Sequence, residues 1–138
     1  MSLVQTQTTS FKVELYEGVH NLLVDDIYIA LYTANADLNQ ATTAYTSTGE
    51  VIASGYTAGG QKLLSPSVNS SGYTAYVDFA NPSWNAAIVA RGALIYNASK
   101  GNKSIAVLDF GADKTSTTLF TVTMPVNTAD SAIIRSSN

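Results

Sequence analysis

The sequence predicts a mainly β protein: an antiparallel β-sandwich or barrel, jelly-roll-like, with one short N-terminal helix. Apolar residues fall in short alternating runs, and Gly, Asn, Ser and Pro separate these runs at the spacing of a sandwich or barrel. The 138 residues are enough for one self-sufficient core. We therefore predict a flexible or partner-bound arm over residues 1–9 and a single β-rich domain over residues 10–138.

The helical pattern lies close to the N-terminus, after the polar, threonine-rich residues 1–9. Ser10 is typical of an N-cap. Apolar side chains then follow at helical spacing: Phe11, Leu15, Val19 and Leu22 or Leu23. This stripe predicts a helix over residues 10–22, although Gly18 weakens it by about 1 kcal/mol relative to alanine.

The first strand is predicted over residues 27–32, where apolar residues alternate on two fairly apolar faces, as in a central strand. A long polar connection over residues 33–48 follows, with a short helical turn predicted near residues 36–40. Extended segments at 50–53 and 61–64 flank the glycine-rich residues 55–60, for which we expect a tight or bulged path.

The second half has a regular antiparallel rhythm. Turns are predicted at 69–72, 97–103 and 111–117, and strands at 73–79, 88–96, 104–110, 118–124 (ended by Pro125) and 132–135. A hairpin closed by the turn at 97–103 places Leu94 opposite Val107, Gly92 near Asp109 and Arg91 opposite Phe110. Either the face that carries Arg91 is partly exposed, or Arg91 is a structural anchor with Asp109 or Asp113 as its partner.

Residues for catalysis or metal binding are sparse, so we predict no catalytic, cofactor-binding or metal-ligating residue and no enzyme. His20 is the single histidine, and no nucleophile elbow lies near it in sequence. Asp25 and Asp26 lack the spaced oxygen ligands of a calcium loop. Glu14 and Glu17 are interpreted as solvated helix residues. Residues 55–60 lack the Gly-Lys-Ser/Thr ending of a phosphate loop.

The aromatic residues suggest packing and interfaces. Trp84, the only tryptophan, precedes a strand and is predicted to plug the end of the β core. Four tyrosines lie close to turns, where they suit either carbohydrate stacking or protein interfaces, and we favour interfaces. These are Tyr32, Tyr45, Tyr56 and Tyr73.

Charge and composition limit the classes of partner that we expect for this chain. Only 12% of residues are charged, the net charge is −3, and the basic residues are scattered, so we expect no direct nucleic-acid partner. No run approaches the ~20 apolar residues of a membrane helix. The N-terminus lacks a signal-peptide pattern and cysteine is absent, which predicts synthesis in a cytoplasm. The weakly charged surface suits either an ordinary neutral protein or a subunit covered by other subunits.

Several segments resemble a family of small structural proteins of tailed bacteriophages, the virion proteins of decoration or tail type. Residues 55–60 (Gly-Tyr-Thr-Ala-Gly-Gly) and 90–96 (Ala-Arg-Gly-Ala-Leu-Ile-Tyr) are the most specific parts. Residues 26–33 and 107–111 also match, and the likeness extends over most of residues 10–125.

The resemblance implies a structural component of a virion, either a capsid decoration (cement) or head-fibre protein. We expect a homo-oligomer, with a trimer preferred, that contacts the major capsid protein or another virion protein after assembly in the host bacterial cytoplasm. The N-terminal arm, the segment 33–48 and the Ser-Ser-Asn tail are the expected contact segments. The alternative is a tail-associated receptor- or glycan-binding module, which predicts an exposed cluster of Tyr45, Tyr56 and Tyr73.

Overall fold

The computed structural model describes residues 2–124, 132 and 134–136. It is mainly β, with antiparallel sheets and one short α-helix, which confirms the predicted fold class. The elements are β1 (Thr6–Gln7), α1 (Thr9–Tyr16), β2 (Ile27–Tyr32), β3 (Gln61–Lys62), β4 (Ser67–Ser71), β5 (Thr74–Asp78), β6 (Ser83–Trp84), β7 (Val89–Asn97), the 3₁₀ helix η1 (Ala98–Lys100), β8 (Lys103–Thr115), β9 (Phe120–Thr121) and β10 (Ile134–Ser136).

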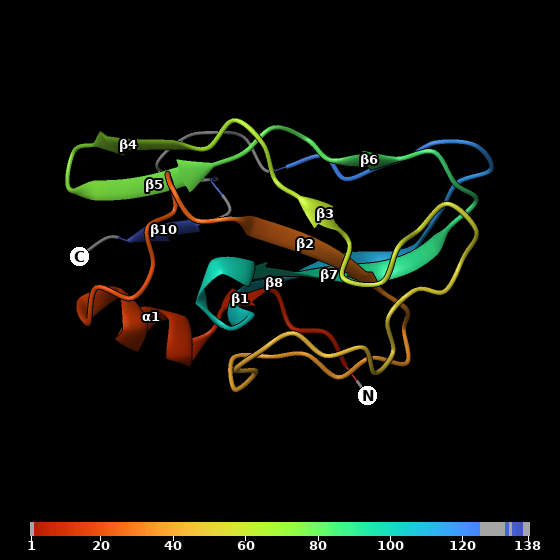
Figure 1. Cartoon of the computed structure of the whole chain (residues 1–138), viewed down its shortest axis with the longest axis horizontal. Coiled ribbons are helices and arrows are strands. Elements are labelled where there is room, and N and C mark those ends of the chain that lie inside the picture. Colours follow the sequence, from red (N-terminus) through yellow and green to blue (C-terminus); the bar gives the residue numbers. More distant parts are fainter. Residues whose placement is uncertain (1, 125–131, 133, 137–138) are drawn as a thin grey trace.

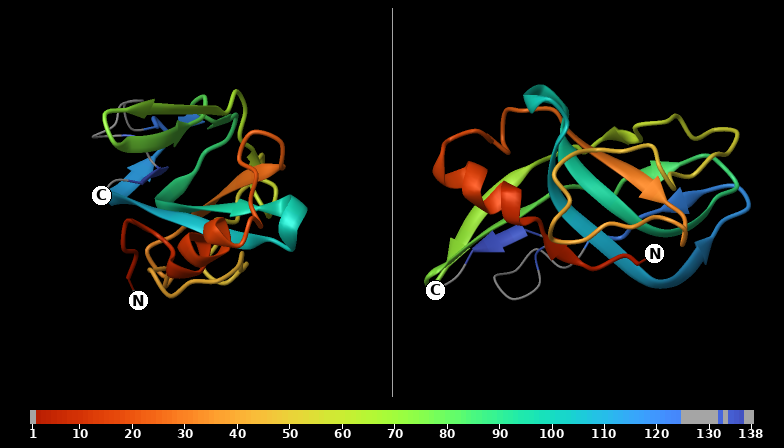
Figure 2. Two further views of the ribbon diagram at one scale, coloured as in Figure 1. Left: turned by 90° about the vertical axis from the view of Figure 1, so that its left-hand side faces the viewer. Right: turned by 90° about the horizontal axis from the view of Figure 1, so that it is seen from below.

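The described strands form three sheets arranged in layers. The largest has five strands in the order β1-β8-β7-β2-β3, a second has the order β10-β5-β4, and β6 pairs with β9. In Figure 1 and in the left view of Figure 2, the segment 33–48 and the sheet containing β4 and β5 lie on opposite sides of the five-stranded sheet. The five-stranded sheet is therefore a middle layer.

Two apolar clusters fill the two sides of this middle layer. The larger one joins β2, β7 and β8 to side chains of the smaller sheets, among them Val77, Phe120 and Ile134. The smaller one contains Tyr32 and Leu94 of the opposite face, with Leu38 of the connection packed against them. Because Ala36 and Leu38 of the connection cover the second face of β2, both faces of this strand are apolar, as the sequence predicted for a central strand.

The helix is shorter than predicted. The N-cap is Thr8 and not the predicted Ser10. The Thr8 hydroxyl accepts a hydrogen bond from the Phe11 N–H. The helix ends with the cap residue Glu17, because Gly18 takes a left-handed φ of 72° that turns the chain out of the helix. Within the helix only Phe11 is buried.

Residues 2–8 of the predicted arm lie along the sheet of their own chain, and Thr9, its last residue, begins α1. Leu3 forms a parallel bridge with Leu38, and β1 pairs with β8 through Thr6 and Gln7. The Thr8 N–H donates to the Ile105 carbonyl at 2.9 Å. The segment thus ties the connection 33–48 to the sheet.

The β7–β8 hairpin confirms most of the predicted register. Leu94 lies opposite Val107, and Gly92 lies opposite Asp109. The prediction that Arg91 faces Phe110 is wrong, because the register shifts between Ala90 and Gly92 at an irregularity of the β-bulge kind.

Other predicted boundaries also move. The predicted turn at 111–117 is wrong because β8 continues to Thr115. The predicted turn at 69–72 falls mostly inside β4, and the hairpin instead turns after Ser71. No helical turn forms at 36–40, residues 50–53 make only a bridge between Glu50 and Tyr32, and the predicted strand 118–124 shrinks to β9.

The last predicted strand, 132–135, can be compared with the structure only at residues 132, 134 and 135, which are described. β10 occupies Ile134–Ser136, within and just beyond the predicted range 132–135. Pro125, proposed to end the preceding strand, lies outside the described residues, as does most of the predicted C-terminal tail.

Candidate functional site

A buried carboxylate is the centre of a cluster of tyrosine hydroxyls. Glu50 is 7% exposed and lies beside β2. Its Oε1 accepts a hydrogen bond from the Tyr45 hydroxyl at 2.5 Å, while its Oε2 accepts bonds from the Tyr56 hydroxyl at 2.6 Å and the Gly59 N–H at 2.8 Å. These three donors compensate the burial of the carboxylate.

A second set of tyrosines surrounds this carboxylate. The Tyr32 hydroxyl donates to the Thr46 carbonyl at 2.6 Å, and the Tyr96 hydroxyl donates to the Gly59 carbonyl at 2.5 Å. Burial, together with the nearby Glu50 charge, raises the pKa of Tyr96 to about 12 and also raises the pKa of Tyr32. Burial and the hydrogen bond to Glu50 also raise the pKa of Tyr45 and of Tyr56. The phenols are therefore protonated donors that clamp the loops over β2.

Sequence reasoning missed this cluster. It considered Tyr45 and Tyr56 as members of an exposed group with Tyr73, but Tyr56 is 8% exposed whereas Tyr73 is 92% exposed at the turn between β4 and β5. The predicted exposed cluster of the three tyrosines is therefore not formed. The available signal was a lone acidic residue, Glu50, directly before the short apolar stretch 51–53.

His20 lies in a closed hydrogen-bond network. It follows α1, and its side chain is fully buried. Its Nε2 lies 2.8 Å from Glu14 Oε1, and its Nδ1 lies 2.9 Å from the Asn97 amide nitrogen. Because that amide donates, we assign the proton of neutral His20 to Nε2. Both ring nitrogens are engaged, which leaves neither free to act as a base. Glu14 holds His20, so its interpretation as a solvated residue is wrong.

The two aspartates after α1 point to different lysines. Asp25 accepts hydrogen bonds from the Asn21 N–H, the Asn97 amide and Lys100 Nζ at 2.8–3.0 Å. Burial opposes ionisation, but these hydrogen bonds outweigh it and lower the pKa of Asp25 to about 2. Asp26 pairs with Lys62 at 2.9 Å, in an exposed position. Within the described part of the chain, no group of three or more His, Asp or Glu is placed to hold a metal ion.

Two further sequence predictions concern packing. Trp84 is 6% exposed, and its ring centroid lies 6.0 Å from that of Tyr56 and 6.3 Å from that of Phe120, which confirms a core position. Arg91 Nε lies 3.3 Å from Asp109 Oδ1, so Asp109 is its partner.

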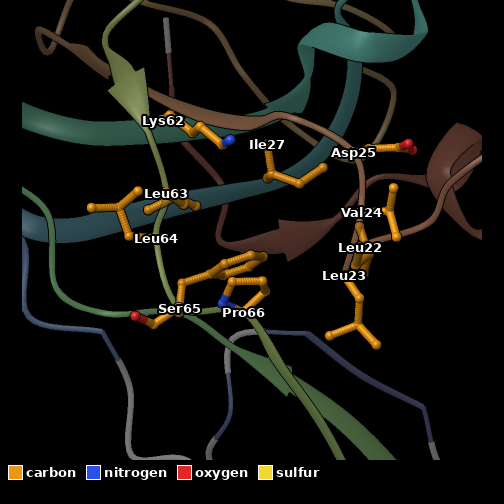
Figure 3. A pocket seen from close by; sticks show the side chains of 11 residues that line it. Leu22, Leu23, Val24, Asp25, Ile27, Lys62, Leu63, Leu64, Ser65 and Pro66 are labelled. Atoms are coloured by element: carbon orange, nitrogen blue, oxygen red, sulfur yellow. The ribbon is translucent and has the colours of Figure 1, made fainter.

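An apolar groove lies between the segment before β2 and the segment after β3 (Figure 3). Leu22, Ile27, Leu63 and Phe79 are its buried floor. The rim is exposed and apolar: Val24 is 75% exposed, Leu64 61% and Leu23 54%. The groove has a volume of about 190 Å³. We call it the apolar groove.

A second groove is lined by basic and polar side chains as well as apolar ones. It runs between α1 and β10 and has a volume of about 500 Å³. Its lining residues are Gln7, Lys12, Leu15, Tyr16, Arg135 and Ser136. No described acidic residue lines it, so we call it the cationic groove.

Comparisons with protein-family models, curated proteins and solved structures found no match. Among the described residues, no helix is both long and apolar enough to span a membrane.

Proposed function

We propose that this chain is a structural subunit of a tailed bacteriophage virion, a capsid decoration (cement) or head-fibre protein. It acts through protein–protein contacts and makes or breaks no covalent bond. The proposal combines the resemblance of residues 55–60 and 90–96 to small virion proteins with one structural observation, the exposed rim of the apolar groove.

The rim of this groove is the kind of surface that a neighbouring subunit covers. Leu23, Val24 and Leu64 are each more than half exposed around one depression. Burying such a side chain fully contributes about 1.5–3 kcal/mol. Because these three are 54–75% exposed, covering what remains of them stabilises a contact by roughly 3–6 kcal/mol in total. Contiguous apolar surface of this kind marks interaction sites, whereas single exposed apolar residues do not.

The polar clusters support a role without catalysis. The carboxylate of Glu50 and the ring of His20 each have all their hydrogen bonds made by protein groups. Groups closed in this way stabilise a fold, whereas a catalytic group needs a reactive atom within reach of substrate. This is the basis for proposing that the protein is not an enzyme.

We propose that a second copy of this chain occupies the apolar groove, in a homo-oligomer for which a trimer is preferred. The charged residues that line the groove are Asp25 and Lys62, which have opposite signs, so the groove presents no net charge. A chain with only 12% charged residues matches such a surface. The assembled ring then contacts the major capsid protein or another virion protein.

The oligomer is tested by sedimentation of the full chain and two variants. The doubly substituted Val24→Asp, Leu64→Asp chain places charges on the rim and is expected to sediment as a monomer. Ile52→Asp is the matched control, because Ile52 is 99% exposed and outside the groove. A strictly monomeric wild type, or dissociation by Ile52→Asp alone, contradicts the proposed contact.

The place in the particle is tested by electron microscopy of intact virions that carry a labelled chain. A regular lattice of label on the shell, or labelled fibres at the head, supports the proposal. Label at the tail tip supports the alternative, a receptor- or glycan-binding module. Because Tyr45 and Tyr56 converge on Glu50 instead of joining Tyr73, that alternative requires a binding surface other than the predicted tyrosine cluster.

A further inference from the structure

The cationic groove joins two positive side chains with an exposed aromatic ring on a chain whose net charge is −3. We propose that this groove binds a short acidic saccharide, a sugar that carries a carboxylate. The site is independent of the apolar groove, since the two share no lining residue.

The two cations approach from different elements. Lys12 projects from α1 and Arg135 from β10, and both line the groove. Lys62, Lys100 and Arg91 each pair with an aspartate, whereas neither Lys12 nor Arg135 has an ion-pair partner among the residues that the structure describes. A carboxylate between them would receive charge-assisted hydrogen bonds, in which arginine can engage both oxygens.

The aromatic ring favours a sugar over a simple anion. Tyr16 is the last residue of α1 and is 92% exposed. It lies four residues after Lys12, so the two side chains share one face of the helix. A phenol ring offers an apolar face with a polar end, which suits the C–H face and the hydroxyls of a saccharide.

The remaining polar groups supply donors and acceptors together. The Gln7 amide nitrogen donates to the Arg135 carbonyl at 2.7 Å, which fixes this side chain and leaves its amide oxygen as an acceptor. Ser136 can donate and accept. The volume of about 500 Å³ lies within the usual range of small-molecule sites, about 300–1,000 Å³.

The same hydrogen bond disfavours an acidic peptide as the occupant. A peptide added to the edge of β10 would use the free backbone groups of that strand. The Arg135 carbonyl is already occupied by Gln7. We therefore expect a compact ligand that uses side chains, and an acidic peptide is an outcome of the test.

The test is titration calorimetry of the full chain with digalacturonate, and with neutral galactobiose and triglutamate as comparison ligands. We expect saturable binding of digalacturonate that weakens as salt is raised, with no measurable binding of the other two. Lys12→Ala and Arg135→Ala should each reduce affinity about tenfold, the usual effect of losing a hydrogen bond to a charged group. Tyr16→Ala should reduce it several-fold.

Matched controls are present in the chain. Tyr73→Ala removes an equally exposed tyrosine, 92% accessible, at the turn between β4 and β5, and Lys103→Ala removes a lysine of β8; neither residue lines either groove. Both should bind like the wild type, and circular dichroism should show that every variant is folded. Absent binding, equal affinity for galactobiose or triglutamate, or equal losses in the controls would each overturn the proposal. Val24→Asp with Leu64→Asp should leave saccharide binding intact, which separates this proposal from the assembly proposal.

Discussion

Asp25→Asn removes the charge that links the segment after α1 to the end of β7 and to η1. Asp25 accepts hydrogen bonds from the Asn21 N–H, the Asn97 amide and Lys100 Nζ. A pKa of about 2 in place of 3.8 corresponds to roughly 2 kcal/mol of stabilisation at about 1.4 kcal/mol per pH unit. Lys100 is 39% exposed, so water screens that ion pair. We therefore expect Asp25→Asn to lower the free energy of unfolding at pH 7 by about 1–2 kcal/mol.

The effect should depend on pH in a defined direction. The pKa of Asp25 is lower in the folded chain than in the unfolded chain, so its contribution is complete well above 3.8 and is lost as the pH falls towards 2. Urea denaturation at pH 7, 4 and 2.5 should therefore show a difference between wild type and variant that shrinks with acid. The Asp26→Asn control, at a carboxylate that is 56% exposed, should change stability by less than about 1 kcal/mol. An undiminished difference at pH 2.5, or equal losses in the two variants, would refute this reasoning.

Two further substitutions examine the buried tyrosine cluster and the glycine-rich segment. Glu50→Ala leaves the buried Tyr56 hydroxyl, the half-buried Tyr45 hydroxyl and the Gly59 N–H without their acceptor, and should lower the free energy of unfolding by about 3–5 kcal/mol. Tyr56→Phe should cost about 1–2 kcal/mol. Urea denaturation measures both, and an unchanged stability of Glu50→Ala would show that these hydrogen bonds do not stabilise the fold. Gly60→Ala would place a Cβ against the Ile29 carbonyl oxygen, closer than the two atoms can approach, at a φ of 79°, and should prevent folding or lower the melting temperature strongly. Gly72→Ala, with a φ of 59° and open space around it, should cost about 1 kcal/mol, measured by thermal melts of both variants. Similar melting temperatures for the two glycine variants would contradict the close approach at Gly60.

Local pattern predicted the strands of the middle layer well. Alternation identified residues 27–32, and the turn at 97–103 was enough to place Leu94 opposite Val107. These features depend on neighbours in sequence, namely the side-chain period of two and the length of a hairpin loop. The fold class followed from the same local signals.

The local apolar pattern shows neither the end of the helix nor the polar clusters, and the clusters depend on contacts between residues that are distant in sequence. The helix ends before Gly18, whose left-handed φ turns the chain, although the apolar stripe continues in the sequence. Leu22 contributes instead to the floor of the apolar groove. The acceptor of Tyr45 and Tyr56 is a side chain in the extended segment beside β2, and His20 meets Asn97 from the far end of β7. Neither pairing leaves a local pattern, so the polar clusters and the two grooves became visible only in three dimensions.

The coverage of the middle sheet has a geometric consequence for any assembly. One broad side is occupied by the smaller sheets and the other by residues 33–48, so both of the largest flat areas are already used by the chain itself (Figure 2). Neighbours can therefore contact the outer faces of these coverings or edges such as the rim that carries Val24 and Leu64, but not the middle sheet itself. Many small subunit contacts, each weak on its own, would then hold a lattice of such units together. The stability of the lattice would grow with the number of copies.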